Sequence, residues 1–183
     1  MTERRIAMLV GSLRAQSTNL RLARAIEKLA PDNLRFGYVK MDDLPFYNGE
    51  LEGDRPANVR RFADAIRAAD AICCTTPEYN RSIPAVLKNA IDWGSKPPAD
   101  NVWRDKVFAM TGASPGGIGT AIAQQHLRQI LAIQGCIVMP GEAYISFKTP
   151  DMILEDGTVT DPSVAAFLTA FAARFAGLID KMA

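Results

Sequence analysis

The stretch RRIAMLVGSLRAQSTNLRLARAIEKL, residues 4–29, holds the pattern that decides the fold. Residues 6–10 form a short apolar run that ends at Gly11, as expected for a strand buried on both faces. From Leu20 onward, apolar residues recur at the spacing of one helix face until Pro31 ends the pattern. A strand, a polar loop and a helix therefore follow one another, an order that is typical of α/β proteins.

The same order repeats along the rest of the chain. Further strands are predicted at residues 34–39, 71–76, 107–110 and 136–139, and further helices at about residues 56–69, 83–93, 118–131 and 162–182. Short buried strands that alternate with helices predict a parallel sheet covered on both faces, because parallel strands need crossover connections. We find no internal repeat and no linker, so residues 1–183 are predicted to form a single α/β domain.

Composition and charge exclude several classes of function. Lys and Arg number 21 against 20 Asp and Glu, which leaves a formal net charge of +1. This balance predicts no nucleic-acid partner and no polybasic membrane surface. The apolar run after the N-terminal arginines is too short for a signal peptide, and the three cysteines lack the spacing of metal ligands. The sequence therefore predicts a cytoplasmic protein with reduced thiols, no membrane partner and no metal site.

Three polar loops follow the carboxyl ends of predicted strands, which is where an open parallel sheet binds its ligands. They are rich in Gly, Pro, Ser, Thr and Asn, and they cover residues 11–19, 77–82 and 111–119. The same residue types also build ordinary turns, so composition alone leaves both interpretations open.

The first of these loops carries donors for an anionic group. Ser17 is a candidate N-cap, and the first N–H groups and the dipole of the following helix favour a negative charge. The candidate phosphate ligands are Ser12, Arg14, Ser17, Thr18 and Asn19. The alternative is a well-capped helix beside a solvated arginine. Because the loop lacks GxGxxG and also Gly-Lys-Ser/Thr, it favours a mononucleotide phosphate over a dinucleotide or a nucleoside triphosphate.

Three motifs together resemble those of the NADPH-dependent FMN reductase family, a flavodoxin-like group that includes bacterial quinone and chromate reductases. They are the loop Gly11–Asn19, the segment PEYNRSIPAVLKNAIDW at residues 77–93, and the segment SPGGIG at residues 114–119. Their order and spacing match from residue 4 to about residue 150. The resemblance implies a flavodoxin-like, doubly wound, five-stranded parallel sheet with the strand order 2-1-3-4-5 and with helices on both faces.

The resemblance also implies roles for single residues. The first-loop residues Ser12, Arg14, Ser17, Thr18 and Asn19 would hold the phosphate of FMN. The isoalloxazine ring would be lined, mostly through backbone groups, by Pro77, Glu78, Tyr79 and Asn80. The other side of the flavin would be closed by Ser114, Gly116 and Gly117.

The chemistry implied by the resemblance needs no catalytic residue from the protein. NADPH or NADH would pass a hydride to N5 of FMN, and the reduced flavin would give two electrons to a small acceptor such as a quinone or a flavin. Because donor and acceptor would use the same open face in turn, ping-pong kinetics are expected.

Two alternatives use the same fold. A flavodoxin-type electron carrier would be strongly acidic, whereas this chain has a net charge of +1. A flavin-free interaction module would need neither the first loop nor the Tyr79-Asn80 segment. These features favour the reductase, but they leave open the physiological acceptor and the choice between NADPH and NADH.

Four further residues are interpreted from their place in the pattern. Cys73 and Cys74 fall inside a predicted buried strand and are interpreted as core residues rather than catalytic thiols. His126 has no metal-ligand partner nearby and is interpreted as a surface or interface residue. Trp93, near the predicted ligand-binding end, is interpreted as an interface anchor, with burial in the core as the alternative. Together with the family resemblance, it predicts a homodimer or a homotetramer.

Overall fold

A computed structural model describes residues 2–183 and contains one parallel sheet at its centre. Its strands are β1 (Arg4–Val10), β2 (Leu34–Tyr38), β3 (Ala71–Thr75), β4 (Val107–Ser114) and β5 (Ile137–Val138). They pair in the order β2-β1-β3-β4-β5, and every pair is parallel. This order confirms the predicted flavodoxin-like topology, in which the chain reverses direction across the sheet between β1 and β3.

The sheet also has a short strand that the sequence did not predict. This strand, β6 (Tyr144–Ser146), pairs in parallel with the last three residues of β4, while β5 pairs with the first two residues of β4. The three residues of β6 are too few to establish an alternation, whereas β5 lies within the strand predicted at residues 136–139. Together they border β4 near both of its ends.

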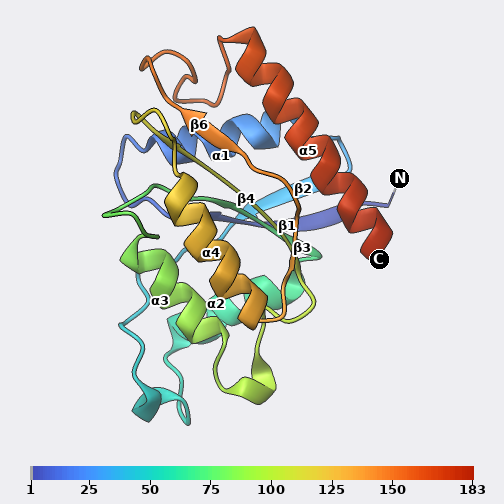
Figure 1. Cartoon of the computed structure of the whole chain (residues 1–183). Coiled ribbons are helices and arrows are strands. Elements are labelled where there is room, and N and C mark those ends of the chain that lie inside the picture. The colour runs from blue at the N-terminus through green and yellow to red at the C-terminus, as the bar shows by residue number, and fades with distance from the viewer. Residues whose placement is uncertain (1) are drawn as a thin grey trace.

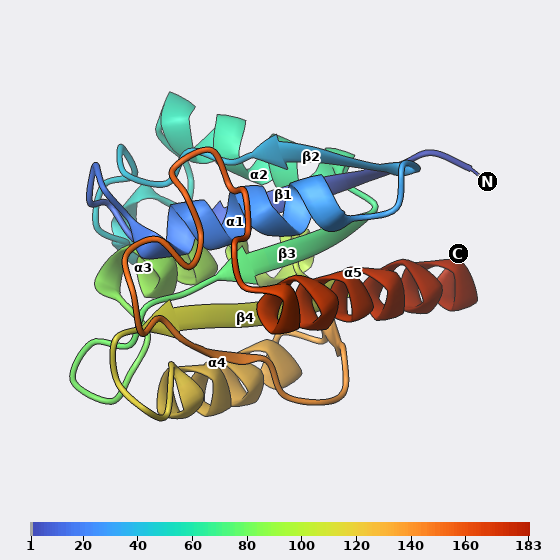
Figure 2. The same ribbon diagram turned by 90° about the horizontal axis from the view of Figure 1, so that it is seen from above.

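Helices cover both faces of the sheet (Figures 1 and 2). One face carries α1 (Thr18–Leu29) and α5 (Pro162–Met182). The other carries α2 (Ala57–Ala68), α3 (Ala85–Gly94) and α4 (Ala121–Ile133). Two short 3-10 helices, Gly49–Leu51 and Pro98–Asp100, lie in the connections. The predicted helices are confirmed, although α4 begins three residues after Ile118.

Alternation along each strand divides the core into two layers. In β3, Cys73 belongs to the apolar cluster beneath α1 and α5, whereas Cys74 belongs to the cluster beneath α2, α3 and α4. Both side chains are fully buried, which confirms their interpretation as core residues. Burial raises the pKa of the Cys73 thiol to about 12, so this thiol stays protonated near neutral pH.

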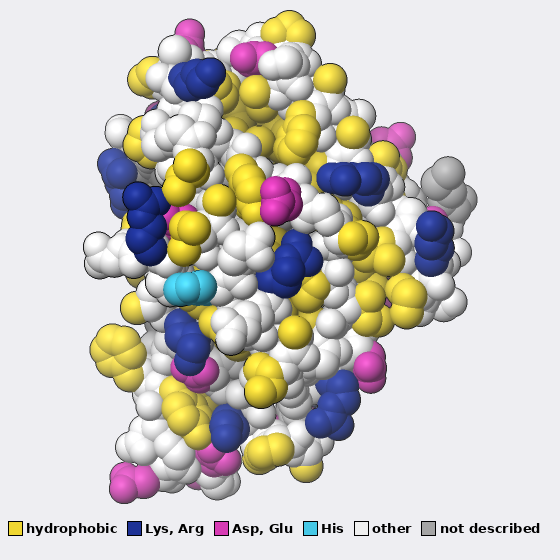
Figure 3. Space-filling model, in the orientation of Figure 1, with side chains coloured by type: hydrophobic (Ala, Val, Ile, Leu, Met, Phe, Trp, Pro, Cys, Tyr) yellow, Lys and Arg dark blue, Asp and Glu magenta, His cyan; other side chains and the backbone are white. Residues whose placement is uncertain are grey.

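Helix α5 is long and apolar enough, by length and composition alone, to cross a membrane. Its buried side chains Leu168, Phe171, Phe175 and Ile179 belong instead to the core cluster that α1 also contributes to. Next to the start of α5, apolar side chains reach the surface beside β6 (Figure 3). One face of α5 therefore packs in the core, and the rest of the helix is less buried.

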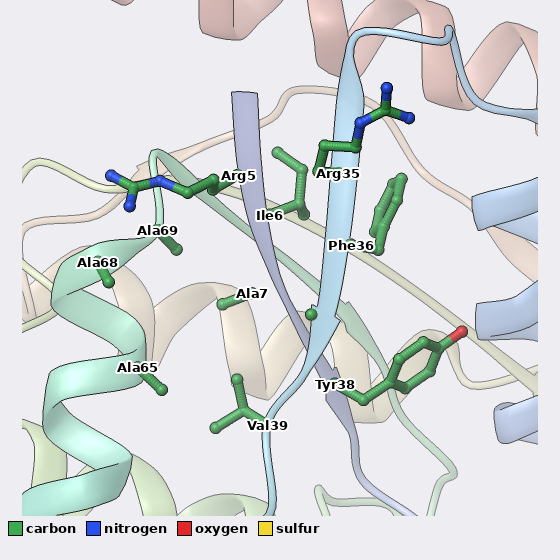
Figure 4. Close-up of a pocket in the computed structure, with 11 residues that line it drawn as sticks. Arg5, Ile6, Ala7, Arg35, Phe36, Tyr38, Val39, Ala65, Ala68 and Ala69 are labelled. Carbon is green, nitrogen blue, oxygen red and sulfur yellow. The ribbon is translucent and has the colours of Figure 1, made fainter. Parts of the chain in front are cut away.

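The loops after β1, β3 and β4 gather at one end of the molecule, and the N- and C-terminal ends lie at the opposite end (Figure 2). A hollow of about 370 Å³ lies away from these loops, between α2 and the edge strand β2 (Figure 4). Ala65 and Ala68 of α2 line one side of it, and Arg5 and Arg35 lie near one end. Because ligands of this fold bind at the carboxyl ends of the strands, the functional site is expected among the loops after β1, β3 and β4.

Candidate active site

The first loop presents unpaired backbone donors at the start of α1. Ser17 is the N-cap, as predicted: its Oγ accepts a hydrogen bond from the N–H of Leu20 at 3.1 Å. Within residues 2–183, the N–H groups of residues 12–19 have no hydrogen-bond partner. Arg14 is exposed and forms no ion pair with a described residue. Free N–H groups at a helix start beside a cation suit the phosphate of a mononucleotide.

Asn19 has a different role from the one predicted for its side chain. Its Nδ2 donates to the carbonyl oxygen of Ala113 at 3.0 Å, and its Oδ1 accepts from the N–H of Ala113 at 2.9 Å. The side chain is buried, and Thr75 Oγ1 donates to the Asn19 carbonyl oxygen at 2.9 Å. The amide therefore joins the first loop to the end of β4, and only the backbone N–H of Asn19 is free for a phosphate.

The second loop, residues 77–82, is a tight hairpin. Tyr79 and Ser82 exchange two backbone hydrogen bonds of 2.9 Å, and the two residues between them have positive φ angles: 51° at Asn80 and 64° at Arg81. This is the pattern of a type I′ turn, which Asn tolerates and in which Gly is common. An arginine held in the left-handed region costs roughly 1–3 kcal/mol, and such strain concentrates at functional sites.

The side chain of Glu78 joins the second loop to α4. Its Oε2 accepts from the N–H groups of Ile122 and Ala123 at 3.0 and 3.1 Å, and its Oε1 accepts from Arg81 at 2.9 Å. The family resemblance implied that Glu78 lines the flavin ring, mostly through backbone groups. The carboxylate instead caps the N-terminus of α4, where a negative charge is favoured by the free N–H groups.

The third loop closes on itself and faces the second. Ser114 Oγ donates to the Gly119 carbonyl oxygen at 2.7 Å and accepts from the N–H of Gly116 at 3.2 Å. Gly119 has a φ of 58°, and a Cβ there would lie 3.1 Å from the backbone nitrogen of Ile145. Between the two loops lies an open hollow of about 470 Å³, which is lined by Glu78, Asn80, Arg81, Ser114 and residues 116–119.

The structure thus gathers most of the predicted site residues at one end of the sheet. Pro77 is buried where the second loop leaves β3, and Tyr79 is 46% exposed. Ser12 and Thr18 are half-buried in the first loop, which the Asn19 side chain holds beside Ala113. Arg81, which the sequence analysis did not single out, also lines the hollow. The one sequence signal for Arg81 was its position directly after Asn80 in the segment at residues 77–93.

Trp93 is not at the surface, and its interpretation as an interface anchor is wrong. The side chain is fully buried, and its Nε1 donates to the carbonyl oxygen of Pro45 at 2.7 Å. Tyr47 packs edge-on against its ring, with 5.2 Å between the centroids. Both partners come from the long connection after β2, so the helix pattern around Trp93 contained no information about them. The alternative, a tryptophan in the monomer core, is correct.

His126 is exposed on α4, as predicted, and appears as the cyan side chain in Figure 3. Its Nδ1 lies 3.2 Å from Ser82 Oγ, which gives the second loop another contact with α4.

A parallel sheet in the order β2-β1-β3-β4-β5, with the first loop after β1 and two facing loops after β3 and β4, defines a flavodoxin-like protein. The model of the NADPH-dependent FMN reductase family matches residues 4–150. The chain belongs to this family and is an oxidoreductase that uses FMN and NAD(P)H.

Several known reductases are similar to this protein over nearly the whole length of the chain. A quinone reductase of Pseudomonas putida is 42% identical over 177 residues, which cover 95% of this chain and 94% of that protein. A 2-hydroxy-1,4-benzoquinone reductase of a Burkholderia species is 40% identical and covers 96% of each chain. The solved structure of a flavoenzyme NAD(P)H:(acceptor) oxidoreductase from Paracoccus denitrificans superposes with a TM-score of 0.93, at 42% identity and 98% coverage of each chain.

Proposed function

We propose that this protein is an FMN-dependent NAD(P)H:quinone oxidoreductase. The observation that carries the proposal is the run of unpaired N–H groups at residues 12–19, next to Arg14 and at the same end of the sheet as the hollow between the second and third loops. An enzyme is favoured over a flavodoxin-type electron carrier, since the net charge is +1 and the relatives of 40–42% identity are reductases.

Each loop has its own part in the proposed site. The backbone of residues 12–19, with Ser12, Arg14, Ser17 and Thr18, would hold the phosphate of FMN. Pro77, Glu78, Tyr79 and Asn80 would border one side of the ring, and Ser114, Gly116 and Gly117 the other. FMN, when bound, supplies the two-electron chemistry between a nicotinamide and a quinone. The chain positions these molecules and leaves one open place for a planar substrate at a time, which supports ping-pong kinetics.

The test is the visible spectrum of the purified protein. We expect a yellow protein that releases FMN on denaturation, that is bleached by NADPH or NADH under argon, and that regains its colour when a benzoquinone is added. Parallel titrations with the two nucleotides give the donor preference. A colourless protein that fails to bind added FMN would contradict the proposal, and a bleached protein that no quinone reoxidises would favour the electron carrier.

Arg14→Ala is expected to weaken FMN binding by roughly ten- to a hundredfold, the range for one charge-assisted hydrogen bond. Arg14 is exposed and forms no ion pair with a described residue, so the fold should be unaffected. FMN affinity is measured by fluorescence quenching on apoprotein. Arg60→Ala, which removes an exposed arginine from α2, serves as the matched control. If the two variants bind FMN with equal affinity, Arg14 is a solvated loop residue that does not contact the phosphate.

We also propose a cytoplasmic homodimer or homotetramer. With Trp93 in the core, the support comes from exposed apolar side chains at and before α4: Ile118, Ile122 and Ile133 are 50%, 38% and 83% exposed. Sedimentation at micromolar concentration should then give a mass of at least twice the chain's 19.9 kDa. A fully active species of 19.9 kDa would contradict the proposal.

A further inference from the structure

Arg81 is the one cationic residue among those that line the hollow between the second and third loops. Its side chain is 69% exposed, although it forms an ion pair of 2.9 Å with Glu78. Only Nη1 takes part in this contact, and the remaining guanidinium donors have no partner within residues 2–183. The mouth of the hollow therefore holds a cation with free donors.

The charge of Arg81 is only partly offset by its neighbour. The Glu78 side chain is 8% exposed, and its second oxygen accepts from two N–H groups at the start of α4. The positive end of the helix dipole therefore compensates part of the carboxylate charge. The negative charge of Glu78 is shared between Arg81 and the start of α4. The mouth of the hollow therefore keeps an excess of positive charge, which suits an anionic ligand.

The backbone holds Arg81 in a defined place. The residue occupies the second central position of the turn, with a φ of 64°, where a glycine would be unstrained. The turn itself is closed by the two Tyr79–Ser82 hydrogen bonds and is joined to α4 through Glu78. The turn therefore fixes the backbone of Arg81 at the mouth of the hollow, and the ion pair with Glu78 directs its guanidinium.

We propose that Arg81 binds a phosphate group of the nicotinamide co-substrate and thereby selects phosphate-bearing hydride donors over neutral ones. This inference rests on the proposed function. The first loop and Arg14 are assigned to the phosphate of FMN, so the anion at Arg81 is a second one. Guanidinium groups form strong, charge-assisted hydrogen bonds with phosphate, and these contacts form mainly in the donor complex.

The test compares two hydride donors that share the reacting ring. NADPH carries phosphates, whereas 1-methyl-1,4-dihydronicotinamide carries none. In Arg81→Ala, we expect the KM for NADPH to rise about tenfold or more, with kcat nearly unchanged. The KM for the neutral donor should stay within about twofold of the original value. Arg81→Lys, which keeps the charge, should recover part of the loss, and Arg60→Ala should change neither KM.

A second variant separates binding from folding. Arg81→Gly removes the same guanidinium but relaxes the turn, so its melting temperature should equal or exceed that of the parent protein while the KM for NADPH rises as in Arg81→Ala. Equal changes for both donors, or no change for NADPH, would overturn the inference. A lower FMN affinity in Arg81→Ala would also overturn it, because the cation would then serve the FMN phosphate. If the parent protein fails to oxidise NADPH with FMN bound, the proposed function itself is wrong.

Discussion

Asn19→Ala is expected to lower the free energy of unfolding by about 2–6 kcal/mol, which is the largest effect that we predict for a single side chain at the site. The substitution removes both hydrogen bonds to Ala113, a buried residue. A buried donor and a buried acceptor are then left without partners, and each costs about 1–3 kcal/mol. Urea unfolding followed by circular dichroism measures the change.

The same substitution should weaken FMN binding, because the Asn19 side chain holds the first loop beside the end of β4. Gln16→Ala, in the exposed part of the same loop, provides the control and should change stability by less than about 0.5 kcal/mol. If Asn19→Ala were as stable as Gln16→Ala, the two hydrogen bonds to Ala113 would not be important for the fold.

Gly112→Ala is expected to destabilise the protein by about 3 kcal/mol, at the upper end of the usual range for overpacking. A Cβ at this position would lie 2.1 Å from the carbonyl oxygen of Thr76 and 2.2 Å from Thr120 Oγ1. The carbonyl belongs to the backbone, so it can retreat only if the start of the second loop moves away from β4. We therefore expect a lower melting temperature together with weaker FMN binding.

Gly117→Ala is the matched control for this experiment. It makes the same chemical change in the third loop, but its Cβ would meet no atom within 4 Å. Its melting temperature should stay close to that of the parent protein. A Gly112→Ala variant that melts at the same temperature as Gly117→Ala would show that the end of β4 can relax without cost.

Several features of this protein follow from local sequence alone. The strand at residues 4–10, its polar loop and the amphipathic helix are visible because burial of one face imposes a period on the apolar residues. The N-cap at Ser17 is equally local, since its partner is the N–H of Leu20. The motifs at residues 77–93 and 114–119 carried the family resemblance, and with it the order of the strands.

Other features depend on contacts between distant parts of the chain. Asn19 and Ala113 lie 94 positions apart, and Glu78 lies 44 and 45 positions from the α4 residues that it caps. Trp93 contacts Pro45 and Tyr47, which belong to a connection without a periodic pattern. The sequence therefore determined which residues form the elements and loops, because propensity and periodicity act over a few neighbours. Only the tertiary structure decided which polar side chains hold the loops together, because the partners of a side chain are set by packing across the whole sheet.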